Sequence, residues 1–107
     1  MNRPLTSNQL DQLVIRLERN HQCILRMAKK LSSYRYEPKN YEGFIKLREL
    51  RMGFKALIDD HRLAFEALNR KALEKYEAHD RVNALLTRYQ DLEKEMAAYI
   101  LDLQYSP

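Results

Sequence analysis

The residues best suited to binding chemistry lie between positions 26 and 55, where nine basic side chains face only three acidic ones, for a net charge of +6. The bases are Arg26, Lys29, Lys30, Arg35, Lys39, Lys46, Arg48, Arg51 and Lys55. Tyr34, Tyr36, Tyr41 and Phe44 are interleaved with them. Lysine and arginine neutralise phosphates or carboxylates, while tyrosine stacks on nucleobases or anchors a protein partner. The segment therefore predicts a site for an anionic partner.

Two kinds of partner fit this segment, an acidic protein and a nucleic acid. The alternative is that the segment binds nothing and is a solvated helix face whose tyrosines close the end of the core. The segment contains no recognised nucleic-acid motif, and Glu37, Glu42 and Glu49 weaken a phosphate site. We therefore expect an acidic protein partner, with nucleic acid as the second candidate. The expected contact residues are Arg26, Lys29, Lys30, Tyr34, Arg35, Tyr36, Lys39, Tyr41, Lys46 and Arg48.

Residues that could support catalysis or bind a metal are sparse. Glu18 and His21 have the Glu-x-x-His spacing that di-iron bundles use in duplicate, but no second copy of the spacing ends at His61 or His79. The sequence also lacks a glycine-rich phosphate loop and a nucleophile elbow. We therefore expect no enzymatic activity, no catalytic residue, no metal and no cofactor.

Asn20 and His21 are instead expected to form a polar layer in the first helix, with His61 about one turn away on the second. Such a layer can specify the register between two helices. It can also titrate, because histidine changes charge near neutral pH.

The remaining composition bears on the compartment. Cys23 is the single cysteine and cannot form an internal disulfide, which favours a reducing environment. No segment approaches the roughly 18–20 consecutive apolar residues of a membrane span, and the first residues lack the apolar core of a signal peptide. We expect a cytoplasmic protein without a membrane partner.

The positions of the binding residues depend on the helices that carry them. The 107 residues are 45% hydrophobic and 32% charged, with only two glycines and three prolines. This composition favours long helices with short connections in one domain, residues 1–107. The charge is uneven, because residues 1–40 carry +5 whereas residues 77–107 carry −3.

The first helix is expected over about 7–36. Thr6 and Gln9 form a capping-box sequence, and an apolar stripe with helical spacing follows. Pro38 disfavours helical geometry at the residue before it, so the helix should end near Tyr36. Asn40 is a good N-cap for a second helix, and the short connection between the two helices makes them antiparallel neighbours.

The rest of the chain permits two architectures, because one heptad phase runs from Leu47 to Leu103 with a polar interruption at Lys71 and Lys75. In the first, the second helix spans about 41–76, Asp80 caps a third helix over about 80–104, and the three form an antiparallel bundle. In the second, no turn forms because nothing between Leu68 and Val82 is glycine or proline, and residues 41–104 are one helix of about 95 Å. That helix would form a coiled-coil homodimer.

The three-helix bundle is the preferred interpretation of this all-α chain. It leads to a further prediction about the basic segment. A third helix that starts near 80 would stop level with Phe54, so the hairpin end would project beyond it. Parts of five core side chains would then be exposed for a partner, namely Met27, Leu31, Phe44, Leu47 and Leu50.

In size and pattern alone, the chain resembles small helical secretion chaperones, phage-encoded inhibitors and coiled-coil adaptors. That resemblance rests on no shared motif and transfers no residue. The sequence therefore predicts a non-enzymatic interaction module whose basic, tyrosine-rich end binds an acidic protein, with a homodimer as a further possibility.

Overall fold

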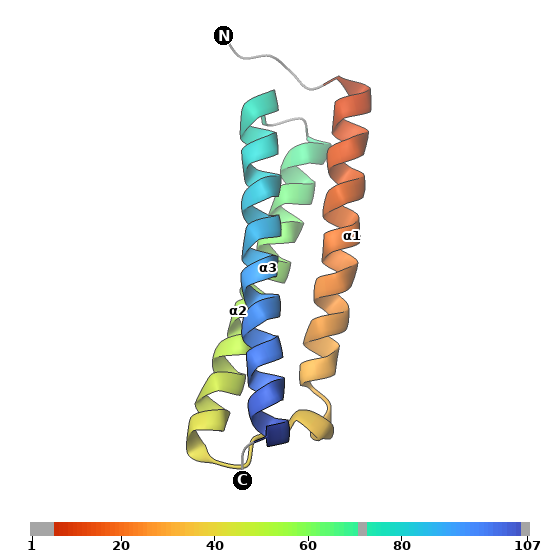
Figure 1. Ribbon diagram of the computed structural model, residues 1–107. Helices are drawn as coiled ribbons and strands as arrows, with labels where there is room; N and C mark the ends of the chain where they lie inside the picture. Colours follow the sequence, from red (N-terminus) through yellow and green to blue (C-terminus); the bar gives the residue numbers. More distant parts are fainter. Residues whose placement is uncertain (1–5, 71–72, 106–107) are drawn as a thin grey trace.

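A computed structural model shows three long helices packed side by side in an antiparallel bundle (Figure 1). The helices are α1 (Ser7–Leu31), α2 (Tyr41–Asn69) and α3 (Lys75–Tyr105), and the short 3-10 helix η1 (Tyr34–Tyr36) lies between the first two. The structure describes residues 6–70 and 73–105. Each long helix contacts both of the others, and the described chain contains no strand. The predicted all-α three-helix bundle is confirmed.

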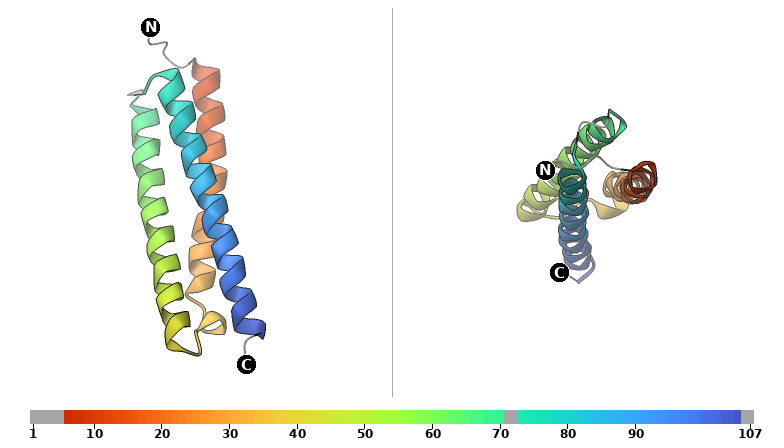
Figure 2. Two further views of the ribbon diagram at one scale, coloured as in Figure 1. Left: turned by 60° about the vertical axis from the view of Figure 1, so that its left-hand side comes forward. Right: turned by 90° about the horizontal axis from the view of Figure 1, so that it is seen from above.

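The bundle is a rod rather than a sphere (Figure 2), with principal dimensions of 57 × 21 × 17 Å. Its radius of gyration of 16.7 Å exceeds the ~13 Å typical of a compact domain of about 100 residues. The excess follows from the helix lengths, because 25 to 31 residues at about 1.5 Å each make helices much longer than the bundle is wide.

Both of the predicted caps on the first two helices are present. The Thr6 hydroxyl accepts a hydrogen bond from the Gln9 backbone N–H, and the Gln9 side chain accepts one from the Thr6 N–H, each at 3.1 Å. Asn40 accepts a bond of 2.8 Å from the backbone N–H of Gly43 at the start of α2. These bonds satisfy amide groups that have no partner within the helix.

The expected end of the first helix near Tyr36 is wrong by about five residues, because α1 ends at Leu31 and the chain continues into η1. Ser33 explains the change. Its hydroxyl accepts from the backbone N–H of Arg35 at 3.4 Å, which gives the chain an alternative to the next helical bond.

The position of the second turn also differs from the expected one. α2 ends at Asn69 and α3 begins at Lys75, so neither the expected boundary near 76–80 nor the continuous helix over 41–104 is found. The coiled-coil homodimer built on that continuous helix is therefore wrong as well. Asp80 lies inside α3; Glu74 instead accepts from the backbone N–H of Glu77. Lys71, part of the polar interruption, lies outside the described residues.

The earlier turn lets α3 run alongside the whole length of α2, so the hairpin end does not project beyond it. Three of the five residues expected to be exposed there are buried, with Leu31, Leu47 and Leu50 between 1% and 5% exposed. Met27 is half-buried, and only Phe44 is largely exposed, at 58%. The predicted overhang is wrong because it depended on the position of the turn.

The core is mainly leucine and also contains Phe54 and Ile24, which are 1% and 0% exposed. Two polar residues, Asn20 and His61, are also buried in it. Among the described helices, none combines the length and the apolar character needed to cross a bilayer.

Candidate functional site

The candidate site is the hairpin tip, which we define as residues 26–48. It comprises the last turns of α1, the η1 connection and the first turns of α2, at the end of the bundle where α3 also finishes (Figure 1). All ten predicted contact residues lie within it. The tip therefore brings the predicted set to one end of the molecule.

Two hydrogen bonds from neighbouring helices hold the backbone of the tip in place. Arg51 on α2 donates to the carbonyl oxygen of Leu31 at the end of α1, at 3.1 Å. The hydroxyl of Tyr99 on α3 donates to the carbonyl oxygen of Tyr36 in η1, at 2.6 Å. Burial raises the pKa of Tyr99, while Arg51 acts in the opposite direction. Tyr99 therefore stays protonated and remains a donor.

The connection into α2 also requires a small residue at position 43. A Cβ atom on Gly43 would lie 2.8 Å from the Cβ of Pro38. Contacts that close force one of the two groups to move, and neither belongs to a flexible side-chain end. Gly43 thus allows the loop to pack directly against the first turn of α2.

Three aromatic side chains are exposed on the tip, namely Tyr34 (77%), Tyr41 (78%) and Phe44 (58%). Tyr36 is half-buried and packs against the core. Phe44 belongs to the apolar stripe that the sequence assigns to the core, but its side chain is on the solvent side of α2. It therefore adds an aromatic group that the predicted contact set omitted.

The bases of the tip are open to solvent. Arg26, Lys29, Lys30, Arg35, Lys39 and Arg48 are exposed, and Lys46 is half-buried. In residues 6–70 and 73–105 the ion pairs are Arg62 with Asp59 and Arg88 with Asp60, and neither involves a base of the tip. The positive charge of the tip bases is thus available to a ligand.

The structure divides some of these bases between two clefts. Arg26 and Lys30 line one of about 180 Å³ between α1 and α3, together with Cys23, Met27 and Tyr89. Burial and a hydrogen bond to Glu93 raise the pKa of Tyr89 to about 12. Burial and the hydrogen bond to Glu93 thus both keep the phenol of Tyr89 neutral at physiological pH.

Lys39 and Lys46 line the second cleft, of about 300 Å³, at the N-terminal end of α2. Its other walls include Asn40, Glu42, Gly43, Tyr99, Asp102 and Leu103. Sequence reasoning missed the α3 residues here, because it ended the third helix level with Phe54. The α3 contribution is acidic, since residues 91–105 carry four acids and only Lys94 as a base. The tip is therefore less positive than residues 26–55 alone indicate.

A second polar cluster lies halfway along the bundle between α1 and α2. Asn20 Nδ2 donates to Nε2 of His61 at 2.9 Å, and the rings of His21 and His61 are 5.7 Å apart. The ring of His21 also meets Phe65 edge-on at 5.7 Å. The predicted polar layer is present, with His61 paired to Asn20.

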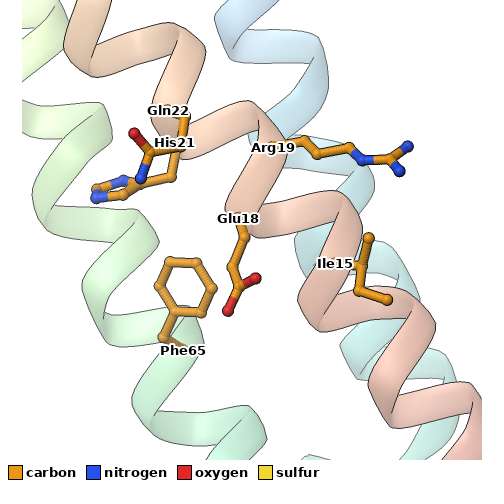
Figure 3. Close-up of a pocket in the computed structure, with 6 residues that line it drawn as sticks. All are labelled: Ile15, Glu18, Arg19, His21, Gln22 and Phe65. Carbon is orange, nitrogen blue, oxygen red and sulfur yellow. The ribbon is translucent and has the colours of Figure 1, made fainter.

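The groove beside this cluster is open and shallow (Figure 3). His21 points toward α2, where Phe65 approaches it, whereas Ile15 and Arg19 point away from that helix. Glu18 and His21 both line the groove, but within the described chain no three potential metal ligands converge. The arrangement fits a contact that specifies helix register.

Comparison of the chain with protein-family models, with curated proteins and with solved structures finds no match in any of the three.

Proposed function

We propose that the chain is a non-enzymatic protein-interaction module whose hairpin tip binds an acidic protein partner. The observation that most supports this is the exposure of Tyr34, Tyr41 and Phe44 among bases that have no ion pair within the described residues. Aromatic and arginine side chains supply much of the binding free energy at protein interfaces. Exposed lysine and arginine would add charge complementarity and faster association with an acidic surface.

A protein partner fits the tip better than a nucleic acid does. Glu42 and Asp102 line the same cleft as Lys39 and Lys46, and Glu37 lies in the adjoining loop. A continuous row of phosphates would meet these carboxylates, whereas a protein can place its own carboxylates only against the bases. Nucleic acid remains the second candidate, because its binding would use the same exposed bases and tyrosines.

The charge requirement can be tested with a fluorescent peptide of glutamates interspersed with leucine. Reversal of three exposed tip bases, Lys29→Glu, Lys30→Glu and Arg35→Glu, should weaken its binding by about tenfold or more in fluorescence anisotropy. The matched control reverses three exposed bases away from the tip, Arg19, Arg70 and Arg81. Equal loss in both triple variants would show a general charge effect and contradict the proposed site.

The aromatic requirement is tested separately. Tyr34→Ala with Tyr41→Ala should weaken peptide binding at unchanged net charge, whereas Tyr76→Ala, which removes a 66% exposed tyrosine at the opposite end, should not. An oligonucleotide of equal charge distinguishes the second candidate. Tight oligonucleotide binding that falls steeply between about 50 and 200 mM salt, without peptide binding, would favour nucleic acid instead.

A further inference from the structure

α2 carries a second apolar stripe, on the side away from the core. Ile45, Met52, Ala56 and Leu63 are spaced by 7, 4 and 7 residues, which places them on one face of the helix. Ile45 is 43% exposed, Met52 60% and Leu63 58%, and Ala56 is exposed as well. We call this set the outer stripe. None of its members is needed to close the core.

The outer stripe lies along the side of α2 that borders α3. Leu63 shares a cleft of about 310 Å³ with Ala84 and Leu85 of α3. Figure 2 (left) shows α2 at one edge of the bundle with α3 beside it and α1 behind. The stripe is therefore open to another molecule along most of the bundle.

One border of the outer stripe is basic. Arg48, Lys55 and Arg62 follow one another at intervals of seven residues and are all exposed. Arg62 reaches Asp59 at 3.9 Å, and the side chain of Arg62 is still 70% exposed. This basic row lies on the side of the stripe that faces away from α3, since Arg51 and Phe65, three residues after Arg48 and Arg62, both contact α1.

The other border comes from α3. It is acidic toward the hairpin tip, whereas beside Leu63 it carries Arg81 and Arg88, of which Arg88 is paired with Asp60. Asp102 lines the cleft at the tip together with residues of α2, and Arg88 pairs with Asp60 of α2. Both residues therefore lie on the side of α3 next to α2. Asp91 and Glu95 follow Arg88 by three and seven residues, so they lie on the same side of α3, and both are exposed. Glu49, at the α3 edge of the stripe, adds another carboxylate. We call Asp91, Glu95 and Asp102 the acidic row.

Two members of the basic row lie level with two members of the acidic row. Gly53 is level with Leu92, because a Cβ at position 53 would meet the Leu92 side chain at 2.8 Å. α2 and α3 run in opposite directions, so Lys55 lies within about one turn of the level of Asp91, and Arg48 within about one turn of Glu95.

We propose that the outer stripe is the contact face for a second copy of this chain, related to the first by a two-fold axis parallel to α2. Such an axis places the outer stripe of one copy against that of the other. The basic border of each copy then faces the α3 border of its partner. Lys55 and Arg48 of one copy then meet Asp91 and Glu95 of the other, and the same two contacts recur on the opposite side of the axis. An antiparallel pairing would set like charges against each other, so the charge pattern selects the parallel arrangement.

The parallel dimer places both hairpin tips at the same end. Two tips side by side could engage a partner with two acidic segments, and the second contact would form at high effective concentration. The dimer itself does not depend on the proposed function, and its test uses molar mass rather than ligand binding.

The test is sedimentation equilibrium of the full chain over a range of concentrations. The mass should rise from 12.8 kDa toward twice that value. Met52→Glu with Leu63→Glu should hold it at the monomer value. The matched control, Ile15→Glu with Leu101→Glu, changes residues of similar exposure on other faces and should still dimerise. A wild-type mass of 12.8 kDa at the highest concentration would overturn the proposal.

Charge exchange tests the symmetry. Lys55→Glu and Asp91→Lys should each raise the dissociation constant about fivefold, the size expected for exposed ion pairs that occur twice. The two changes together should restore the wild-type value, because each restored pair spans the interface. No recovery would contradict the parallel arrangement.

Cross-linking gives an answer that does not depend on the stability of the glutamate variants. In a Cys23→Ser background, Ile45→Cys and Leu63→Cys should each form a disulfide with its own copy under mild oxidation, since both positions meet themselves across a parallel axis. Ile15→Cys is the control and should form no disulfide between copies. If neither stripe variant cross-links, but an amphipathic helical peptide binds the wild-type stripe, the occupant is a foreign helix and the self-association is overturned.

Discussion

Asn20 on α1 and His61 on α2 are joined by a hydrogen bond of 2.9 Å inside the bundle, where Asn20 is 6% and His61 0% exposed. Nδ1 of His61 contacts the carbonyl oxygen of Leu57 at 2.8 Å, so this nitrogen carries the proton. Nε2 is then an acceptor for the Asn20 amide. The pair thus requires a neutral imidazole of one tautomer.

The first prediction concerns pH. Burial lowers the pKa values of His61 and His21 below their ordinary 6.5, and Arg88 and Arg62 act in the same direction, while the Leu57 carbonyl and Asp60 oppose the shift at His61. The unfolded chain therefore binds more protons than the folded chain below pH 6.5. Stability should be complete above about pH 7.5, one unit above the unfolded value, and decline as the pH falls from 7.5 to 5.5. Urea midpoints measured across that range check this.

The control for the pH experiment is the third histidine. His79 has no hydrogen bond or ring contact of this kind among the described residues, so His79→Gln should leave the slope of stability against pH unchanged. A midpoint that stays constant from pH 7.5 to 5.5 in the wild-type chain would show that the two histidines do not control acid stability.

The second prediction concerns the free energy of unfolding. It compares the loss of one partner of the Asn20–His61 pair with the replacement of both partners by apolar residues. Asn20→Ala leaves Nε2 of His61 buried without a donor, which should lower the free energy of unfolding by roughly 1–3 kcal/mol. Replacing both partners, Asn20→Leu with His61→Leu, removes the unsatisfied group and should restore most of that loss. Equal destabilisation by the single and double changes would show that packing, rather than the hydrogen bond, dominates at this site.

How much of this molecule can be predicted from its sequence depends on whether a feature is local. The caps at Thr6 and Asn40 involve residues three apart, and both were predicted correctly. The bases and tyrosines of the tip were also found from the sequence, because the short connection keeps them close together. The polar pair follows from levelling two antiparallel helices about that connection.

The position of the second turn could not be predicted in the same way. The chain between Leu68 and Lys75 contains neither glycine nor proline, and the heptad phase continues through it. The turn forms while α2 still lies alongside α1, since the Asn20–His61 contact places Asn69 level with about residue 12, so the end of the partner helix does not set its position. Because that position sets the reach of α3, the burial of Leu47 and the arrival of Asp102 at the tip were missed with it.

The third prediction concerns the bond that ties the tip to α3. Tyr99→Phe removes the hydroxyl that donates to the carbonyl oxygen of Tyr36 but keeps the ring in the core. The expected loss of stability is about 0.5–1.5 kcal/mol. Hydrogen exchange should become faster at the backbone N–H groups of Tyr36 and Glu37, which bond within η1. Tyr105→Phe, at an 80% exposed tyrosine near the end of the same helix, is the control and should change neither.

The fourth prediction concerns Gly53, a glycine in the middle of α2. Alanine is favoured there by about 1 kcal/mol in helix propensity, but its Cβ would lie 2.8 Å from a terminal methyl group of Leu92. That methyl is the end of a flexible side chain, so it can rotate at a cost that offsets the gain. Gly53→Ala should therefore change the free energy of unfolding by less than about 1 kcal/mol.

A larger residue at the same position distinguishes this explanation from simple tolerance. Gly53→Val adds two methyl groups toward α3, which rotation of one leucine cannot accommodate, and should destabilise by about 1–3 kcal/mol. Leu92→Ala in the Gly53→Val background opens space at the contact, so the double variant should be more stable than the sum of the two single effects. Strict additivity in thermal or urea unfolding would mean that Gly53 and Leu92 do not limit how closely α2 and α3 approach.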